Sequence, residues 1–72
     1  MAKILDEELE KRFTYHQPKG DQAERYTELR LAARNLATMI VNRTPASREQ
    51  ALALTNLEQA VMWANAAVAR NE

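Results

Sequence analysis

The sequence predicts an all-α fold, in which a short N-terminal helix precedes a long antiparallel αα-hairpin and copies of the chain assemble into a homo-oligomeric helical bundle. Three observations predict it. Two long segments carry apolar residues at helical spacings, a proline separates them, and the second segment is apolar around much more than one face. The 72 residues form a single domain, 1–72, and without cysteines so small a fold favours self-association.

The first helix is predicted over residues 3–12, where Leu5 and Leu9 lie one turn apart with acidic residues on the other side. A helix of this length is only marginally stable in isolation. We therefore expect it to dock on another part of the assembly.

Residues 13–20, FTYHQPKG, are predicted to form an ordered loop. Pro18 biases the residue before it toward an extended conformation, and Gly20 permits unusual dihedral angles. The loop holds two aromatic residues, the only histidine of the chain and a lysine, and loops with such a content are often binding sites. We expect Phe13 to close the end of a helix bundle, whereas Tyr15 is open to a binding role.

The hairpin is predicted from two helices, residues 21–43 and 47–71. Pro45 lies in the turn between them, because proline lacks the N–H group that would continue a helix. Asp21 and Ser47 are the expected caps, each followed three residues later by Glu or Gln, as in a capping box. The expected seams are Tyr26, Leu29, Ala33, Leu36 and Ile40 on the first helix, and Leu54, Leu57, Val61, Ala64 and Val68 on the second.

The second long helix carries apolar side chains off its seam, and a helix of this kind needs partners on two sides. The rest of the chain supplies only one long helix, so the other partner is expected to be a second copy of the protein. The residues expected at this interface are Leu52, Met62 and Trp63.

The charges balance to zero overall, but they are distributed unevenly. Residues 11–48 carry eight basic and three acidic side chains, a net charge of +5, whereas residues 1–10 carry one lysine and four acids. A basic middle suggests an anionic partner. The alternative, and the commoner reason for charged helices, is that these side chains only solvate the surface.

Enzymatic motifs are absent from the sequence. The single glycine excludes a Gly-rich phosphate loop, Ser47 is explained as a helix cap, and Glu24 and Glu28 are typical of a solvated helix face. The absence of cysteine excludes a thiolate metal site, and a single histidine cannot build a His-rich one. The apolar runs are too short for a signal peptide or a membrane span. We therefore expect no enzyme, no cofactor, no metal and no membrane partner.

Two blocks of the sequence carry a family resemblance. The first is RFTYHQPKGDQAERY, residues 12–26, continuing to Leu29 and Arg30; the second comprises SREQ from Ser47, LALT from Leu52, MWANA from Met62 and ARNE from Ala69. Together they resemble the small phage proteins that act as anti-CBASS cyclic-oligonucleotide sponges. Related anti-Thoeris sponges share the hairpin.

The resemblance implies a homohexamer with pockets between subunits that bind cyclic dinucleotides such as 3′,3′-cGAMP. In some members it implies separate pockets for cyclic trinucleotides. The resemblance also implies that the ligand is bound and not cleaved, in the cytoplasm of the infected bacterial host, so that the defence effector is deprived of its signal. The anti-Thoeris branch takes up a cyclic ADP-ribose derivative instead.

The residue chemistry is compatible with such a ligand. Bases stack on aromatic side chains, which indicates Tyr15, and phosphates bind Arg or Lys, which indicates Arg30. His16 is a further candidate, although an ordinary loop histidine explains it as well. The supporting candidates are Lys19, Arg25 and Arg12.

For a trinucleotide site the candidate is Arg70, with Arg34 and Arg48 as secondary candidates. A cation at a helix C-terminus, favourable with the helix dipole, explains Arg70 equally well. Two other functions stay open at this point: a helical module that binds nucleic acid or a protein partner, and a structural bundle without a ligand.

Overall fold

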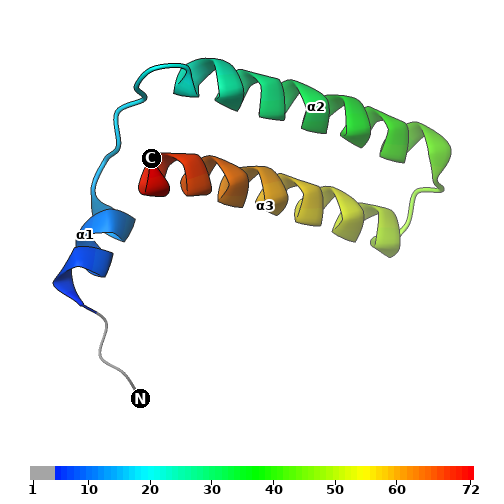
Figure 1. Ribbon diagram of the computed structural model, residues 1–72. Coiled ribbons are helices and arrows are strands. Elements are labelled where there is room, and N and C mark those ends of the chain that lie inside the picture. Colours follow the sequence, from blue (N-terminus) through cyan, green and yellow to red (C-terminus); the bar gives the residue numbers. More distant parts are fainter. Residues whose placement is uncertain (1–4) are drawn as a thin grey trace.

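The computed structural model describes residues 5–72, which form three helices and no strand: α1 (Asp6–Phe13), α2 (Gln22–Arg43) and α3 (Arg48–Asn71). Helices α2 and α3 run antiparallel and side by side, and α1 lies beyond the open end of this hairpin (Figure 1). The predicted all-α hairpin is confirmed. Within residues 5–72 no helix has the length and hydropathy needed to cross a membrane.

Helix α1 starts later than the predicted residue 3. Leu5 has an extended backbone, with φ −74° and ψ 152°, and acts as the N-cap, while residues 3 and 4 lie outside the described range. Three acids follow directly in the first turn, where the helix dipole favours negative charge. At the other end the helix includes Phe13, because the Thr14 N–H donates to the Glu10 carbonyl oxygen at 3.0 Å.

The cap predicted for α3 is present. Ser47 Oγ accepts a hydrogen bond from the Gln50 N–H at 3.1 Å. In a capping box the Gln50 side chain would also accept a hydrogen bond from the Ser47 N–H, and this second bond is absent. The Gln50 side chain donates instead to the carbonyl oxygen and the hydroxyl of Thr44, at 3.1 and 3.0 Å. Gln50 thus closes the turn between the two long helices.

The side-chain cap predicted for α2 is wrong. Asp21 has φ −89° and ψ 11° and makes no capping hydrogen bond, because only an extended cap residue directs its side chain back to the first turn. Gln22 instead closes the turn that precedes the helix. Its Oε1 accepts from the Lys19 N–H at 3.1 Å, and its own N–H donates to the Lys19 carbonyl oxygen at 3.1 Å. Gly20, with φ 58°, makes the tight turn possible.

The seam between α2 and α3 is only half-buried. No hydrophobic side chain within residues 5–72 is fully buried, and the one buried residue is Gln22, which is 4% exposed. Leu29 and Leu36, which were predicted in the seam, lie at its exposed edge, because one partner helix covers only part of each helical surface. The partly covered residues include Tyr26, Ala33, Ala37 and Ile40 on α2, and Leu54, Leu57, Val61, Ala64 and Val68 on α3.

The chain is far more extended than a compact domain. Its radius of gyration is 15.9 Å, whereas a compact 72-residue domain has about 11 Å. Its extent along the shortest axis is 13 Å, comparable to the diameter of one helix, about 10–12 Å.

The predicted interface residues Leu52, Met62 and Trp63 are 43%, 62% and 67% exposed in the single chain.

A polar cluster closes the open end of the hairpin. Arg25 binds Glu72 through both terminal nitrogens, with Nη1 donating to Oε2 at 3.0 Å and Nη2 donating to Oε1. The buried Gln22 donates to the same Glu72 Oε1 at 3.4 Å. The cluster therefore joins the start of α2 to the end of α3.

This cluster gives the hairpin a dependence on pH. The hydrogen bonds from Arg25, opposed in part by desolvation and aided by Gln22, hold the pKa of Glu72 below its ordinary value of 4.5. A carboxylate whose pKa is lower in the folded than in the unfolded protein stabilises the fold at pH values above its unfolded-state pKa. This contribution to stability is lost as the pH falls through the folded-state pKa.

We expect Glu72→Gln to remove part of the acid sensitivity of the fold. The wild type should lose stability relative to the variant as the pH is lowered below about 4.5, because only the wild type has this carboxylate to protonate. Thermal unfolding from pH 7 to pH 3 at one protein concentration measures the difference. Equal pH profiles for the two proteins would contradict the role assigned to the cluster.

We expect Ser47→Ala to lower the free energy of unfolding by about 1 kcal/mol, because the Gln50 N–H loses its acceptor. Ser47→Asp is the control, since its carboxylate restores an acceptor at the same position. Urea unfolding at a fixed protein concentration measures both. A loss of the same size in Ser47→Asp would show that the hydroxyl acts otherwise than as a cap.

Candidate functional site

A pocket of about 370 Å³ lies where the end of α1, the loop, α2 and α3 meet. We call it the basic pocket, because its walls include three arginines and no acid. It is lined by Arg12, Thr14, His16, Tyr26, Arg30, Asn65, Ala66, Ala69 and Arg70. Four of these residues, Arg12, His16, Arg30 and Arg70, were candidates from the sequence.

Helical geometry explains how distant parts of the sequence meet here. Tyr26 and Arg30 lie one turn apart on α2, so they point to the same side. On α3, Ala66 and Arg70 are likewise one turn apart. The methyl side chains of Ala66 and Ala69 leave the space that larger residues would fill.

The arginines of the pocket differ in their pairing. Arg12 Nε lies 3.1 Å from Glu8 Oε1 in an exposed pair one turn apart on α1. Within residues 5–72 neither Arg30 nor Arg70 has a carboxylate partner. Two guanidinium groups beside a pocket without acids favour an anionic ligand, and guanidinium suits phosphate because its donors form a planar fork.

His16 has a structural task in addition to any contact with a ligand. Its Nε2–H donates to the Lys11 carbonyl oxygen at 2.8 Å, one of the carbonyls left free at the end of α1. The bond fixes the loop to the helix and leaves Nδ1 as the second ring nitrogen. His16 thereby holds α1 and Arg12 at the pocket.

Other candidates from the sequence do not line the basic pocket. Tyr15 is 80% exposed on the loop. The Lys19 N–H is bonded to Gln22, and the Arg25 guanidinium is bonded to Glu72. Arg48 begins α3 and therefore lies at the opposite end of the hairpin (Figure 1).

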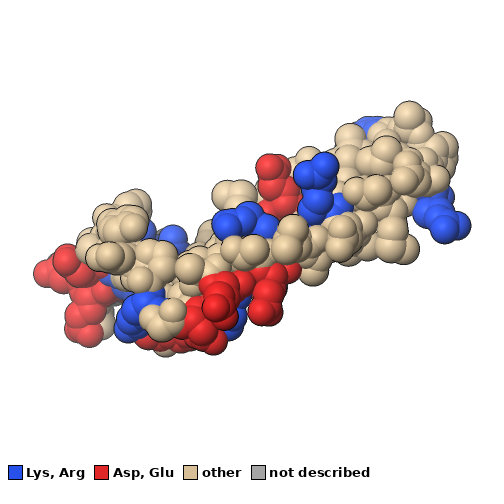
Figure 2. Space-filling model, turned by 90° about the horizontal axis from the view of Figure 1, so that it is seen from above, with Lys and Arg blue, Asp and Glu red and all other residues tan. Residues whose placement is uncertain are grey.

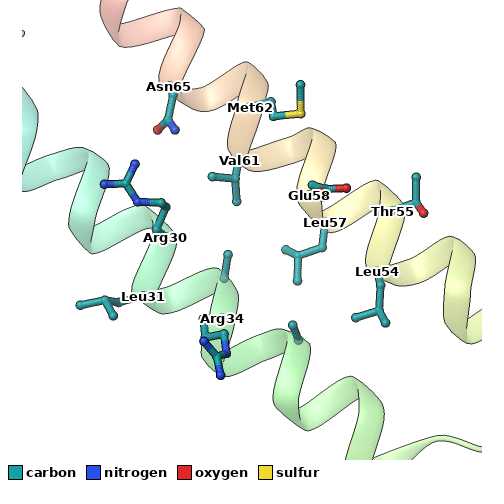
Figure 3. Close-up of a pocket in the computed structure, with 12 residues that line it drawn as sticks. Arg30, Leu31, Arg34, Leu54, Thr55, Leu57, Glu58, Val61, Met62 and Asn65 are labelled. Atoms are coloured by element: carbon teal, nitrogen blue, oxygen red, sulfur yellow. The ribbon is translucent and has the colours of Figure 1, made fainter.

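A second, larger cavity of about 740 Å³ runs along one face of the hairpin, and we call it the hairpin groove. Its walls are mostly apolar and include two further candidates, Arg34 and Met62. The groove is lined by Arg30, Leu31, Ala33, Arg34, Ala37, Leu54, Thr55, Leu57, Glu58, Val61, Met62 and Asn65 (Figure 3). Arg30 and Asn65 line both cavities, and in Figure 3 they face each other from α2 and α3.

Sequence reasoning missed Asn65 and the second role of Tyr26. Asn65 lies on the inward side of α3, and its Oδ1 is buried without a hydrogen-bond partner. A polar residue between the seam positions Val61 and Val68 was the available signal. Tyr26 was assigned only to the seam, and it also gives the basic pocket an aromatic wall.

The charges do not form a continuous basic surface. In the view of Figure 2, acidic side chains gather toward the α1 end, while Lys and Arg side chains are spread along the molecule. Within residues 5–72 no three His, Asp or Glu side chains are grouped so that they could hold a metal ion.

Comparison with known proteins identifies the family. The profile of the Acb2/Tad1 hairpin domain matches residues 5–69, which is almost the whole chain. No curated protein and no solved structure matches the sequence. The resemblance found in the sequence blocks is thus confirmed. The chain belongs to the Acb2/Tad1 hairpin-domain family, whose members are phage sponges for cyclic nucleotide signals.

Proposed function

We propose that this protein binds and sequesters cyclic dinucleotides of bacterial CBASS defence, such as 3′,3′-cGAMP, in the cytoplasm of the infected host and does not cleave them. The observation that carries the proposal is the basic pocket, where Arg30 and Arg70 have no carboxylate partner among the described residues. Family membership supplies the class of ligand.

The chemistry of the pocket fits this ligand. The guanidinium groups of Arg30 and Arg70, with Arg12 beside them, suit the two phosphates of a cyclic dinucleotide. Stacking on an aromatic ring is worth about 1–3 kcal/mol per base. We assign that role to Tyr15, which is exposed on the loop beside the pocket and free to cover a base.

Binding without cleavage is supported by the composition of the walls. Hydrolysis of a phosphodiester needs a general base or a metal-bound water at the scissile bond. No carboxylate lines the basic pocket, and within residues 5–72 no three His, Asp or Glu side chains are grouped so that they could hold a metal ion.

The proposed active form is a homohexamer. A compactly folded chain of this mass exposes about 4,500 Å², and this chain exposes 6150 Å². The excess is about twice the ~800 Å² that each partner buries in a standard interface, so it supports more than one interface per chain. The hairpin groove and the side chains of Leu52, Met62 and Trp63 are the surfaces we assign to these contacts.

The assembly also bears on the size of the binding site. A pocket of about 370 Å³ is near the lower end of the ~300–1,000 Å³ typical of ligand pockets. A ligand with two bases therefore needs walls from a second copy. For cyclic trinucleotides the main candidate stays Arg70, which also lines the basic pocket, followed by Arg34 and Arg48.

A polynucleotide-binding module is less well supported. Such proteins present a basic stripe along which the phosphate backbone runs. In Figure 2 the Lys and Arg side chains are spread along the visible face and acidic side chains gather toward the α1 end, and the net charge of the chain is zero.

We expect the wild-type protein to deplete 3′,3′-cGAMP from solution and to release it intact on heat denaturation. Filtration followed by chromatography of the released nucleotide measures this, with cyclic tri-adenylate and a cyclic ADP-ribose as parallel ligands. Altered products would mean catalysis and contradict the proposal. Depletion of the ADP-ribose alone would assign the protein to the anti-Thoeris branch.

We expect Arg30→Ala to weaken binding at least about tenfold, because hydrogen bonds to charged groups are worth ~1.5–3 kcal/mol. Tyr15→Ala should abolish uptake while the oligomer survives. Arg43→Ala is the matched control, an arginine at the end of α2 that lines neither cavity. Calorimetry measures the affinities, and equal losses in Arg30→Ala and Arg43→Ala would reject the site.

We expect Trp63→Glu to dissociate the assembly, because a charge replaces a large apolar side chain at the proposed interface. Gln59→Glu places the same charge at another exposed position of α3 and should leave the assembly intact. Light scattering after size exclusion measures both masses. An unchanged mass for Trp63→Glu would remove this residue from the interface.

A further inference from the structure

Asn65 occupies an unusual place on α3. It is partly buried on the inward side of the helix, where its neighbours one turn away are Val61 and Ala69. Its Oδ1 is buried and has no hydrogen-bond partner. Burial of an amide oxygen without a donor costs free energy, so such an atom in a native fold calls for a donor that binds it in another state.

Arg30 is the donor that the geometry offers. It faces Asn65 from α2 (Figure 3), and these two residues alone line both the basic pocket and the hairpin groove. A guanidinium has five N–H groups, and that of Arg30 has no carboxylate partner within residues 5–72. Arg30 can therefore give one N–H to Asn65 and keep the others for a ligand.

We propose that Asn65 is a positioning residue, whose amide oxygen accepts a hydrogen bond from Arg30 when the basic pocket is occupied and so directs the guanidinium into that pocket. The inference rests on the proposed function, since it assumes that Arg30 binds the anionic ligand. Because the bond forms in the occupied pocket, its free energy adds to that of ligand binding.

The chemical identity of Asn65 fits this role. An amide oxygen orients a guanidinium and leaves its positive charge available. A carboxylate in the same place would also orient it, but would neutralise the charge that a phosphate needs. The inference thus predicts that Asn and Asp, although nearly equal in shape, differ in their effect on ligand affinity.

The test is a double-mutant cycle with 3′,3′-cGAMP, measured by calorimetry at low salt. Asn65→Leu keeps the branching at Cγ but has no amide, and it should weaken binding about tenfold, the size of one hydrogen bond to a charged group. In an Arg30→Ala background the same change should have no effect, because Asn65 then has no guanidinium to position. Equal losses in both backgrounds would overturn the inference.

Two further variants separate positioning from a general structural role. Asn65→Asp should weaken binding and reduce its salt dependence, because one positive charge is cancelled; a wild-type affinity for this variant would overturn the inference. The matched control is Asn56→Leu, which changes an exposed asparagine of the same helix that lines neither cavity. This variant should bind the ligand as the wild type does.

The proposed function and the inference fail in different ways. The absence of binding by the wild type would overturn the proposed function. Binding by the wild type together with an unchanged affinity of Asn65→Leu would overturn the inference alone.

Discussion

Two antiparallel helices form a layer that has two faces and no interior, and the rest of this structure depends on that constraint. Each helix can cover only the strip that its partner touches, so even Leu54 and Val61 stay partly exposed and no hydrophobic side chain within residues 5–72 is fully buried. The turn at one end and the polar cluster of Gln22, Arg25 and Glu72 at the other hold the layer together. In the assembly that we propose, other copies of the chain supply further stabilisation.

The polar cluster also determines where the basic pocket can form. By fixing the end of α3 against the start of α2, it places Arg70 opposite Arg30, residues 40 positions apart in the sequence. The hydrogen bond between His16 and Lys11 then brings the end of α1 to the same place. The pocket is therefore a consequence of two contacts between mainly polar groups, and the apolar seam only sets the distance between the helices.

The helices were predictable because their signals are local. The helical spacing of the apolar residues, Pro45 in the turn and Ser47 as a cap all act within a few residues, and the structure has them as expected. The predictions that failed concern polar side chains, for which several hydrogen-bond partners compete. Asp21 has the correct residue type for a cap, but its backbone is not extended and Gln22 closes the turn instead.

The candidate site was predictable in residue type but not in arrangement. Basic residues of the middle segment and Arg70 were singled out separately, and only the hairpin geometry brings Arg30 and Arg70 into one pocket. Arg25 looks equivalent to Arg30 in the sequence, yet it is bonded to Glu72, which lies 47 positions away. Pairing over such a distance leaves no local pattern, and for the same reason Asn65 gave only a weak signal as a polar residue on an apolar stripe.

Arg30 and Asn65 belong to the walls of two cavities, and this sharing has a thermodynamic consequence. If one cavity binds a nucleotide and the other a neighbouring subunit, both binding events alter the same two side chains. Nucleotide binding and subunit assembly are then thermodynamically linked. Linkage is reciprocal, so a nucleotide that tightens the assembly is itself held more tightly by the assembled protein. The capacity to retain a nucleotide would then rise faster than in proportion to the concentration of the protein.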